Sequence, residues 1–279
     1  RRLAGELLQL KHGRKPSGCL ITTFDSALGS QKHLIDQINN HQGEGREARV
    51  MLIADEAHGL GAETRQQLLI KRVDYRLGLT ATFTRHFDEE GTALLDKYFD
   101  GHIARVSIDD AIHKYKTLVQ YRYHPVLVQL AEDETEYYEE LSDQISRLYA
   151  MSKNSWADFE KLAKIKMLER ASILKHAAGK IGAFRKVVSE LEEKKYILVY
   201  SAEGTGPVGA GTRQDEDLLA VLADLGINSR EFNGDRPREA RVHLQGELDQ
   251  GRIDCLVAMK CLDEGIDIPE ARVGFFVAS

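Results

Sequence analysis

The chain has 279 residues, of which 42% are hydrophobic and 29% charged, with only five prolines and a formal net charge of -6. This composition excludes a disordered or fibrous protein, and the length suits about two globular domains. The negative charge provides no overall basic field, so any nucleic-acid binding must rely on local phosphate contacts.

The cellular setting can be inferred from what the sequence lacks. No run of about 18 apolar residues occurs, which predicts no membrane association. Cys19, Cys255 and Cys261 lack metal-ligand spacing, and an odd number of cysteines does not complete a disulfide framework. We therefore expect a cytoplasmic protein. The start at Arg1 fits neither a signal peptide nor an initiator methionine, so we expect a piece of a longer chain.

Short apolar runs predict the strands of the first half. Residues 19–23, 50–54 and 75–80 are apolar and separated by polar or helical stretches, a pattern typical of buried parallel strands that alternate with helices. From residue 134 to 178 the apolar spacing becomes three to four, which predicts long helices. The apolar positions are Tyr138, Leu141, Ile145, Leu148, Phe159, Leu162, Ile165 and Leu168. We expect them to pack, with partner docking or strand guiding as the alternative.

A second alternation of strands and helices follows. The predicted strands are residues 196–200, 229–232, 255–259 and 273–278, and the predicted helices are residues 215–225 and 237–249. The glycine-rich residues 204–211 form the one flexible loop expected between a strand and a helix. The second half is therefore also α/β.

Two adjacent carboxylates carry the clearest chemistry. Residues 50–58 form an apolar strand that ends in Asp55 and Glu56, followed by His58. Ligands of parallel α/β sheets bind at the carboxyl ends of strands. Neighbouring strand residues point to opposite sides, so Asp55 can hold a hydrated magnesium ion while Glu56 polarises an attacking water. A solvated acidic turn is the structural alternative.

About twenty residues later, residues 77–82 form another apolar strand that ends in Thr80, Ala81 and Thr82. In this order and spacing the two stretches resemble motifs II and III of superfamily 2 helicases, the DEAH box and the Thr-Ala-Thr triplet. The resemblance implies ATP and magnesium as cofactors. It also implies that His58 couples hydrolysis to movement through Thr80 and Thr82.

Residues 261–269 of the second half resemble motif V of the same family. The resemblance implies that Gly265 and Asp267 approach the nucleotide from the far side of the cleft, where glycine permits close backbone contact. Gly234 and Arg241 reproduce the glycine and arginine spacing that precedes this motif. The structural alternatives are a strand exit at residues 265–267 and a helix start at Pro237.

Several further residues are expected along a nucleic-acid track. Residues 20–24 and 198–201 resemble motifs whose hydroxyls contact the nucleic-acid backbone, which assigns this role to Thr22, Thr23 and Ser201. Gly234 and Arg241 are expected along the same track. Such hydroxyls bind phosphates without surplus positive charge. The short spacing from motif II to motif III and residues 85–92 look like XPB-like helicases and restriction-enzyme translocase subunits. This resemblance favours DNA as the nucleic-acid partner, with RNA as the alternative. Protein partners in a larger complex are also expected.

The resemblance predicts two RecA-like parallel-sheet domains joined by a helical segment. Residues 1–130 would be the C-terminal part of domain 1, residues 131–178 the connecting helices, and residues 179–279 a domain 2 that stops before motif VI.

Parts of the family pattern are missing from this sequence. No Gly-x-x-x-x-Gly-Lys-Ser/Thr loop occurs, residues 206–213 are only a near miss, and Met259 stands where many relatives carry a phosphate-contacting threonine. We therefore expect an ATP-dependent DNA helicase or translocase whose present chain is inactive alone. The alternatives are a non-catalytic nucleic-acid-binding or protein-binding scaffold and an RNA helicase.

Overall fold

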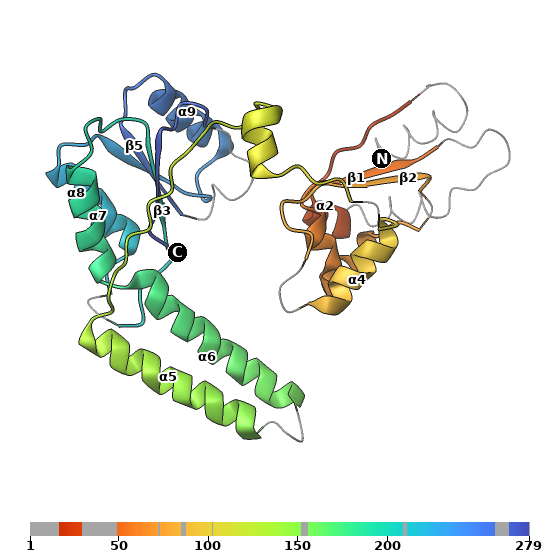
Figure 1. The fold of residues 1–279 in the computed structure, drawn as a ribbon, viewed down its shortest axis with the longest axis horizontal. Coiled ribbons are helices and arrows are strands. Elements are labelled where there is room, and N and C mark those ends of the chain that lie inside the picture. Colours follow the sequence, from red (N-terminus) through yellow and green to blue (C-terminus); the bar gives the residue numbers. More distant parts are fainter. Residues whose placement is uncertain are drawn as a thin grey trace. The chain divides into compact units, whose positions relative to one another are not determined.

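The computed structural model describes residues 17–29, 49–71, 73–84, 88–101, 103–151, 156–208, 211–259 and 268–278. The chain divides into two units, Arg1–Tyr121 and Arg122–Ser279, and each has its own parallel β-sheet (Figure 1). The predicted α/β class with parallel sheets is therefore confirmed. The domain limits placed at residues 130 and 178 stay predictions.

The sheet of the first unit pairs two predicted strands. Strands β1 (Met51–Ala54) and β2 (Tyr75–Gly78) run parallel, with Met51 opposite Tyr75 and Ala54 opposite Gly78. The helices in the described part of this unit are α2 (Phe24–Leu28), the 3-10 helices η1 (Ala57–Gly61) and η2 (Glu63–Leu68), α4 (Glu89–Tyr98) and the π-helix η3 (Asp110–Lys114).

One face of this sheet forms the core of the unit. The buried cluster contains Ala27, Ala54, Ala57, Leu60, Leu68, Ile70 and Leu95. Side chains alternate along a strand, so Leu52 and Ala54 point into this cluster while Met51 and Ile53 point away and are exposed. The helices thus cover the core-facing side of the sheet.

The strand predicted at residues 19–23 is wrong. These residues adopt no regular structure, and Leu20 and Ile21 are exposed. Thr23 is the N-cap of α2, and its hydroxyl accepts a hydrogen bond from the Ser26 backbone N at 3.2 Å. A threonine hydroxyl that caps a helix competes with strand formation, which explains why the apolar run before it was misleading.

The second unit contains a four-stranded parallel sheet. Its strands are β3 (Ile197–Ser201), β4 (Ser229–Phe232), β5 (Cys255–Met259) and β6 (Val273–Phe276). Their spatial order is β4-β5-β3-β6, so β3 and β5 occupy the centre. All four strands lie within the ranges predicted for them or within one residue of those ranges.

Helices cover both faces of this sheet (Figure 1). They are α7 (Gly179–Ser189), α8 (Gln214–Asp224) and α9 (Arg238–Asp249). On the face of α7 and α8, Val199 and Val257 are fully buried, and on the face of α9, Phe232 and Leu256 are fully buried. Burial on both faces explains why β3 and β5 read as continuous apolar runs.

Two long helices precede this sheet, α5 (Glu132–Met151) and α6 (Trp156–His176). They pack on each other, and Leu141 and Ile145 of α5 are buried as predicted. The expected packing of Leu162, Ile165 and Leu168 is wrong.

Three members of the predicted α6 stripe are exposed, the side chain of Phe159 lies outside the described residues, and part of the contact between α6 and α5 is polar. Leu162, Ile165 and Leu168 are 46%, 51% and 64% exposed. Arg170 instead donates to the Ser142 hydroxyl at 3.0 Å and lies over the Tyr138 ring. No helix in the described part of the chain is long and apolar enough to cross a membrane.

Glu134 joins the start of α5 to the start of α7. Its carboxylate is 5% exposed, and it accepts hydrogen bonds from the Ala131 backbone N at 2.9 Å and from the Ala178 backbone N at 2.8 Å. Ala131 directly precedes α5, and Ala178 is the N-cap of α7. One negative charge therefore lies at two helix N-termini, where the helix dipoles favour it.

Residues 119–127 cross from the first unit to the second and are exposed throughout. Val119 is 84% exposed and Leu127 is 98% exposed. The segment is held at its end, where Val128 packs against Gly179 so closely that a Cβ on this glycine would lie 2.7 Å from Val128 Cγ1.

Candidate functional site

Asp55 and Glu56 follow β1 at its carboxyl end, and both are exposed. Asp55 Oδ1 accepts a hydrogen bond from the Glu56 backbone N at 3.1 Å. Glu56 has φ 49° and ψ 46°, a left-handed conformation that is uncommon for residues other than glycine. This turn sends the chain directly into η1 and brings Glu56 back toward His58.

His58 connects Glu56 to the end of β2. Its Nδ1 lies 3.0 Å from Thr80 Oγ1 and 3.2 Å from Glu56 Oε2. Backbone bonds set this distance, because Leu79 N donates to Ala54 O at 2.8 Å and Ala57 N donates to Leu79 O at 2.9 Å. The pairing of β1 with β2 therefore continues past both strands and places the two predicted motifs side by side.

The hydrogen bonds of Thr80 indicate which His58 tautomer fits. Thr80 Oγ1 donates to the Thr82 carbonyl O at 3.0 Å and accepts from the Thr82 N at 3.2 Å. The proton of the hydroxyl is thus used, and a carboxylate such as that of Glu56 can only accept. The tautomer with the proton on His58 Nδ1 therefore fits this arrangement, since it donates toward these two oxygens.

The predicted nucleic-acid residues lie at different depths. Thr22 and Thr23 are exposed, and the Thr22 hydroxyl donates to the Thr23 carbonyl O at 3.2 Å. Ser201 is buried, and its hydroxyl donates to the Ala258 carbonyl O at 3.3 Å, so it does not face solvent. Gly234 is exposed after β4, and Arg241 is half-buried on α9 with its Nε unpartnered among the described residues.

Two predicted nucleotide-binding residues, Gly265 and Asp267, lie outside the described residues. Within the described part of the chain, no three side chains of His, Cys, Asp or Glu gather as a metal site.

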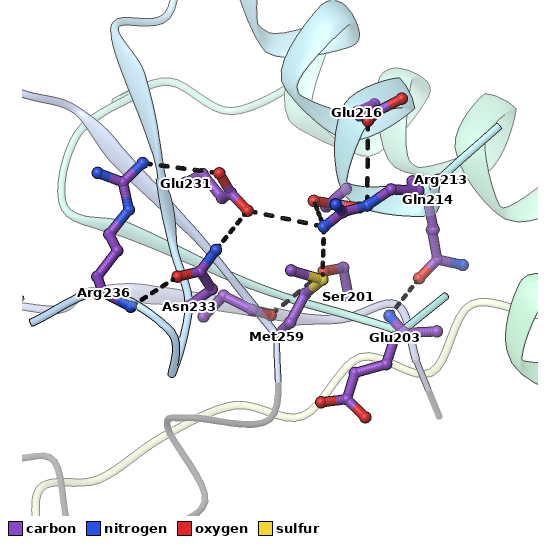
Figure 2. A network of polar contacts seen from close by, with 12 residues as sticks. Ser201, Glu203, Arg213, Gln214, Glu216, Glu231, Asn233, Arg236 and Met259 are labelled. Carbon is purple, nitrogen blue, oxygen red and sulfur yellow. Dashed lines mark hydrogen bonds and ion pairs between the residues drawn. The ribbon is translucent and has the colours of Figure 1, made fainter. Parts of the chain in front are cut away.

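A polar network that the sequence did not predict lies at the carboxyl ends of β3, β4 and β5 (Figure 2). Arg213 donates through Nε and Nη2 to the buried Asp215 carboxylate at 3.1 and 2.8 Å, and Nη2 also lies 3.3 Å from Met259 Sδ. This paired carboxylate raises the pKa of the Arg213 guanidinium.

The network continues from Arg213 to β4. Glu231 lies 3.7 Å from Arg213 Nη2 and 3.6 Å from Arg236 Nη2, and it accepts from Asn233 Nδ2 at 2.8 Å. Each guanidinium therefore has a carboxylate partner, so this edge is not a surplus positive patch. Arg213 meets Glu231 and Met259 only because of the order of the strands, so the sequence carries no local signal for these two contacts.

One protein-family model matches the C-terminal part of the second unit. Residues 179–278 match the helicase conserved C-terminal domain. This stretch begins at α7 and continues past β6, so it includes the whole four-stranded sheet. The helicase-like character predicted for the second half is thus shown at the level of this domain.

A curated relative is similar over a shorter stretch, whereas solved structures match most of the chain at low identity. UvrABC system protein B from Dechloromonas aromatica (strain RCB) is 41% identical over 61 residues, which is 22% of this chain and 9% of that protein. Among solved structures, the Hef helicase domain of Pyrococcus furiosus covers 87% of this chain and 69% of its own, with 16% identity and a TM-score of 0.46. The SWI2/SNF2 ATPase core of Sulfolobus solfataricus, in complex with dsDNA, covers 92% and 61%, with 13% identity and a TM-score of 0.40.

Proposed function

We propose that the natural protein containing this chain is an ATP-dependent DNA helicase or translocase of superfamily 2, with two RecA-like domains. The helicase C-terminal domain match over residues 179–278 supports the family assignment. The observation that carries the catalytic part is the position of His58, within 3.2 Å of Glu56 Oε2 and 3.0 Å of Thr80 Oγ1. The contact of His58 with both side chains supports the helicase-motif interpretation over that of a solvated acidic turn.

The exposed carboxylates suit magnesium-bound ATP. Magnesium keeps most of its waters in such sites and needs only one or two carboxylates besides the phosphates. Asp55 is exposed and can hold a water of the ion, and Glu56 is 63% exposed and can accept the proton of an attacking water. ATP supplies the phosphoryl group and the driving force when bound. Gly265 and Asp267 would approach it from the second domain.

His58 and Thr80 would set the direction of the Glu56 carboxylate. A shift of residues 80–82 moves the Thr80 hydroxyl, and with it the imidazole that donates toward Glu56 Oε2. Through this relay, movement at the end of β2 can change how well Glu56 is aimed at water. Thr22, Thr23, Gly234 and Arg241 remain the proposed contacts to the nucleic acid, whereas Ser201, also expected there from the sequence, is buried and bonded to the Ala258 carbonyl O. Protein partners are expected in a larger complex.

The proposal is tested by phosphate release from ATP, measured on the longest natural protein that carries this sequence. Turnover is compared without nucleic acid and with single-stranded DNA, duplex DNA or RNA. We expect DNA to stimulate turnover and Glu56→Gln to abolish it, because glutamine does not accept the proton of water. Glu63→Gln, an exposed carboxylate on η2, is the matched control.

The outcomes separate the alternatives. Stimulation by RNA alone would reverse the choice of DNA. No turnover under any condition would refute the motor and leave a nucleic-acid-binding scaffold. The chain of residues 1–279 by itself should be inactive, because its sequence contains no lysine loop for the β- and γ-phosphates.

A further inference from the structure

Arg65 holds the first residues of α2 in two ways. Its guanidinium lies 5.5 Å from the centre of the Phe24 ring, and its Nη2 donates to Asp25 Oδ1 at 3.3 Å. Phe24 and Asp25 directly follow Thr23 in the chain. The arginine, which belongs to η2, is therefore attached to the segment whose hydroxyls are proposed to meet the nucleic acid.

The side chains of Arg65 and Phe24 also lie against Gly59, in the turn that follows Glu56. A Cβ on Gly59 would lie 3.2 Å from Arg65 Nη1 and 3.4 Å from Phe24 Cε2. The Gly59 backbone N donates to the Glu56 carbonyl O at 2.8 Å. A continuous set of contacts therefore runs from α2, through Arg65 and Phe24, to the residue that holds Glu56 in its turn.

The polar part of this contact is exposed and contributes little to folding. The side chain of Asp25 is 81% exposed and that of Arg65 is 36% exposed, and exposed ion pairs stabilise proteins only weakly. The buried Leu60 and Leu95 hold the unit together instead. Arg65 can therefore change partners, or be replaced, while the unit remains folded.

We propose that Arg65 is a positioning residue that couples nucleic-acid contact at Thr22 and Thr23 to the aim of Glu56. This inference rests on the proposed motor function. Phosphates beside Thr22 and Thr23 would fix the start of α2, and the guanidinium over the Phe24 ring would pass that constraint to Gly59. Lysine has the charge but not the planar fork needed to contact both Phe24 and Asp25.

The test measures ATP turnover of the natural protein with Arg65→Gln, without DNA and at saturating single-stranded DNA. We expect unchanged basal turnover and DNA-stimulated turnover at least about fivefold lower, the low end of ordinary coupling between two sites. Arg65→Lys keeps the charge but not the planar fork, so it should likewise lack stimulation. Asp25→Asn combined with Arg65→Gln removes the uncompensated carboxylate and should still lack stimulation, which separates positioning from charge.

Two further variants test the path. Gly59→Ala should displace Arg65 Nη1 and lower stimulation, with little added effect in the Arg65→Gln background. Arg76→Gln is the control, because Arg76 also lies over an aromatic ring, that of Tyr98, but contacts neither α2 nor Gly59 in the described structure. It should keep full stimulation.

A second measurement does not depend on turnover. Single-stranded DNA should change hydrogen exchange at the Gly59 amide in the wild-type protein and leave it unchanged in Arg65→Gln. Full stimulation of Arg65→Gln at saturating DNA, equal loss of its basal turnover, or the same defect in Arg76→Gln would overturn the coupling role alone. Absence of DNA-stimulated turnover in the wild-type protein would overturn the proposed function as well.

Discussion

Replacing Glu134 with alanine should weaken the attachment of α5 to the four-stranded unit. The buried carboxylate accepts one hydrogen bond from the Ala131 backbone N and one from the Ala178 backbone N. Alanine leaves both donors without their acceptor at the starts of two helices. A hydrogen bond to a charged group contributes about 1.5 kcal/mol or more, so the loss should be about 3 kcal/mol.

The change can be graded with a second substitution. Glu134→Gln keeps one carbonyl oxygen and presents an amide N–H₂ to the other donor, so it should cost about half as much as alanine. With a urea dependence of about 2 kcal/mol per M, Glu134→Ala should lower the unfolding midpoint by about 1.5 M.

The assay is urea unfolding followed by far-UV circular dichroism. If Glu134→Ala unfolded at the wild-type midpoint, the double cap would contribute nothing. The apolar contacts of Leu141 and Ile145 would then suffice to hold α5.

Three further predictions concern the core, a buried thiol and acid stability. Phe232→Ala should cost about 3–5 kcal/mol and lower the Tm of the second unit, because this ring is fully buried. Burial raises the pKa of the Cys255 thiol, so iodoacetamide should alkylate exposed Cys19 first in the native protein. The hydrogen bond from the Tyr137 hydroxyl is the main cause that lowers the pKa of Glu169, and Lys166 is a smaller one. Tyr137→Phe should therefore destabilise α5 and α6 at neutral pH and progressively less in acid.

The sign of the last prediction follows from linkage. A lowered pKa in the folded state means that the ionised Glu169 carboxylate favours folding above its ordinary pKa, and this contribution disappears as the pH falls through the lowered value. Urea unfolding at neutral and acidic pH measures the difference. A loss of stability in Tyr137→Phe that stayed constant with pH would contradict the prediction.

For the thiols, site-resolved mass spectrometry should show equal alkylation only after denaturation, and equal native rates would contradict burial of Cys255.

The sequence predicted most of the α/β framework because buried parallel strands are short, continuous apolar runs. The ranges predicted for residues 229–232 and 255–259 coincide with β4 and β5. The same reasoning failed at residues 19–23, where a capping threonine follows the apolar run. It also failed on α6, where spacing identified an apolar stripe but not which face meets α5.

The candidate site was predictable in part. The resemblance to helicase motifs suggested that His58 and Thr80 act together, and the structure brings their side chains within 3.0 Å. The left-handed conformation of Glu56 had no sequence signal, since the residue is not a glycine. The contact of Arg213 with Met259 joins residues that are brought together only by the order of the strands.

The exposed residues 119–127 offer a natural place to divide the molecule. Trypsin cleaves after arginine, and Arg122 lies in this segment at the boundary between the units. A cut there would disturb no buried side chain, because residues 119–127 are exposed. The C-terminal fragment would retain Glu134 and both of its backbone donors. Brief digestion should therefore yield a durable fragment that contains the matched residues 179–278 together with α5 and α6.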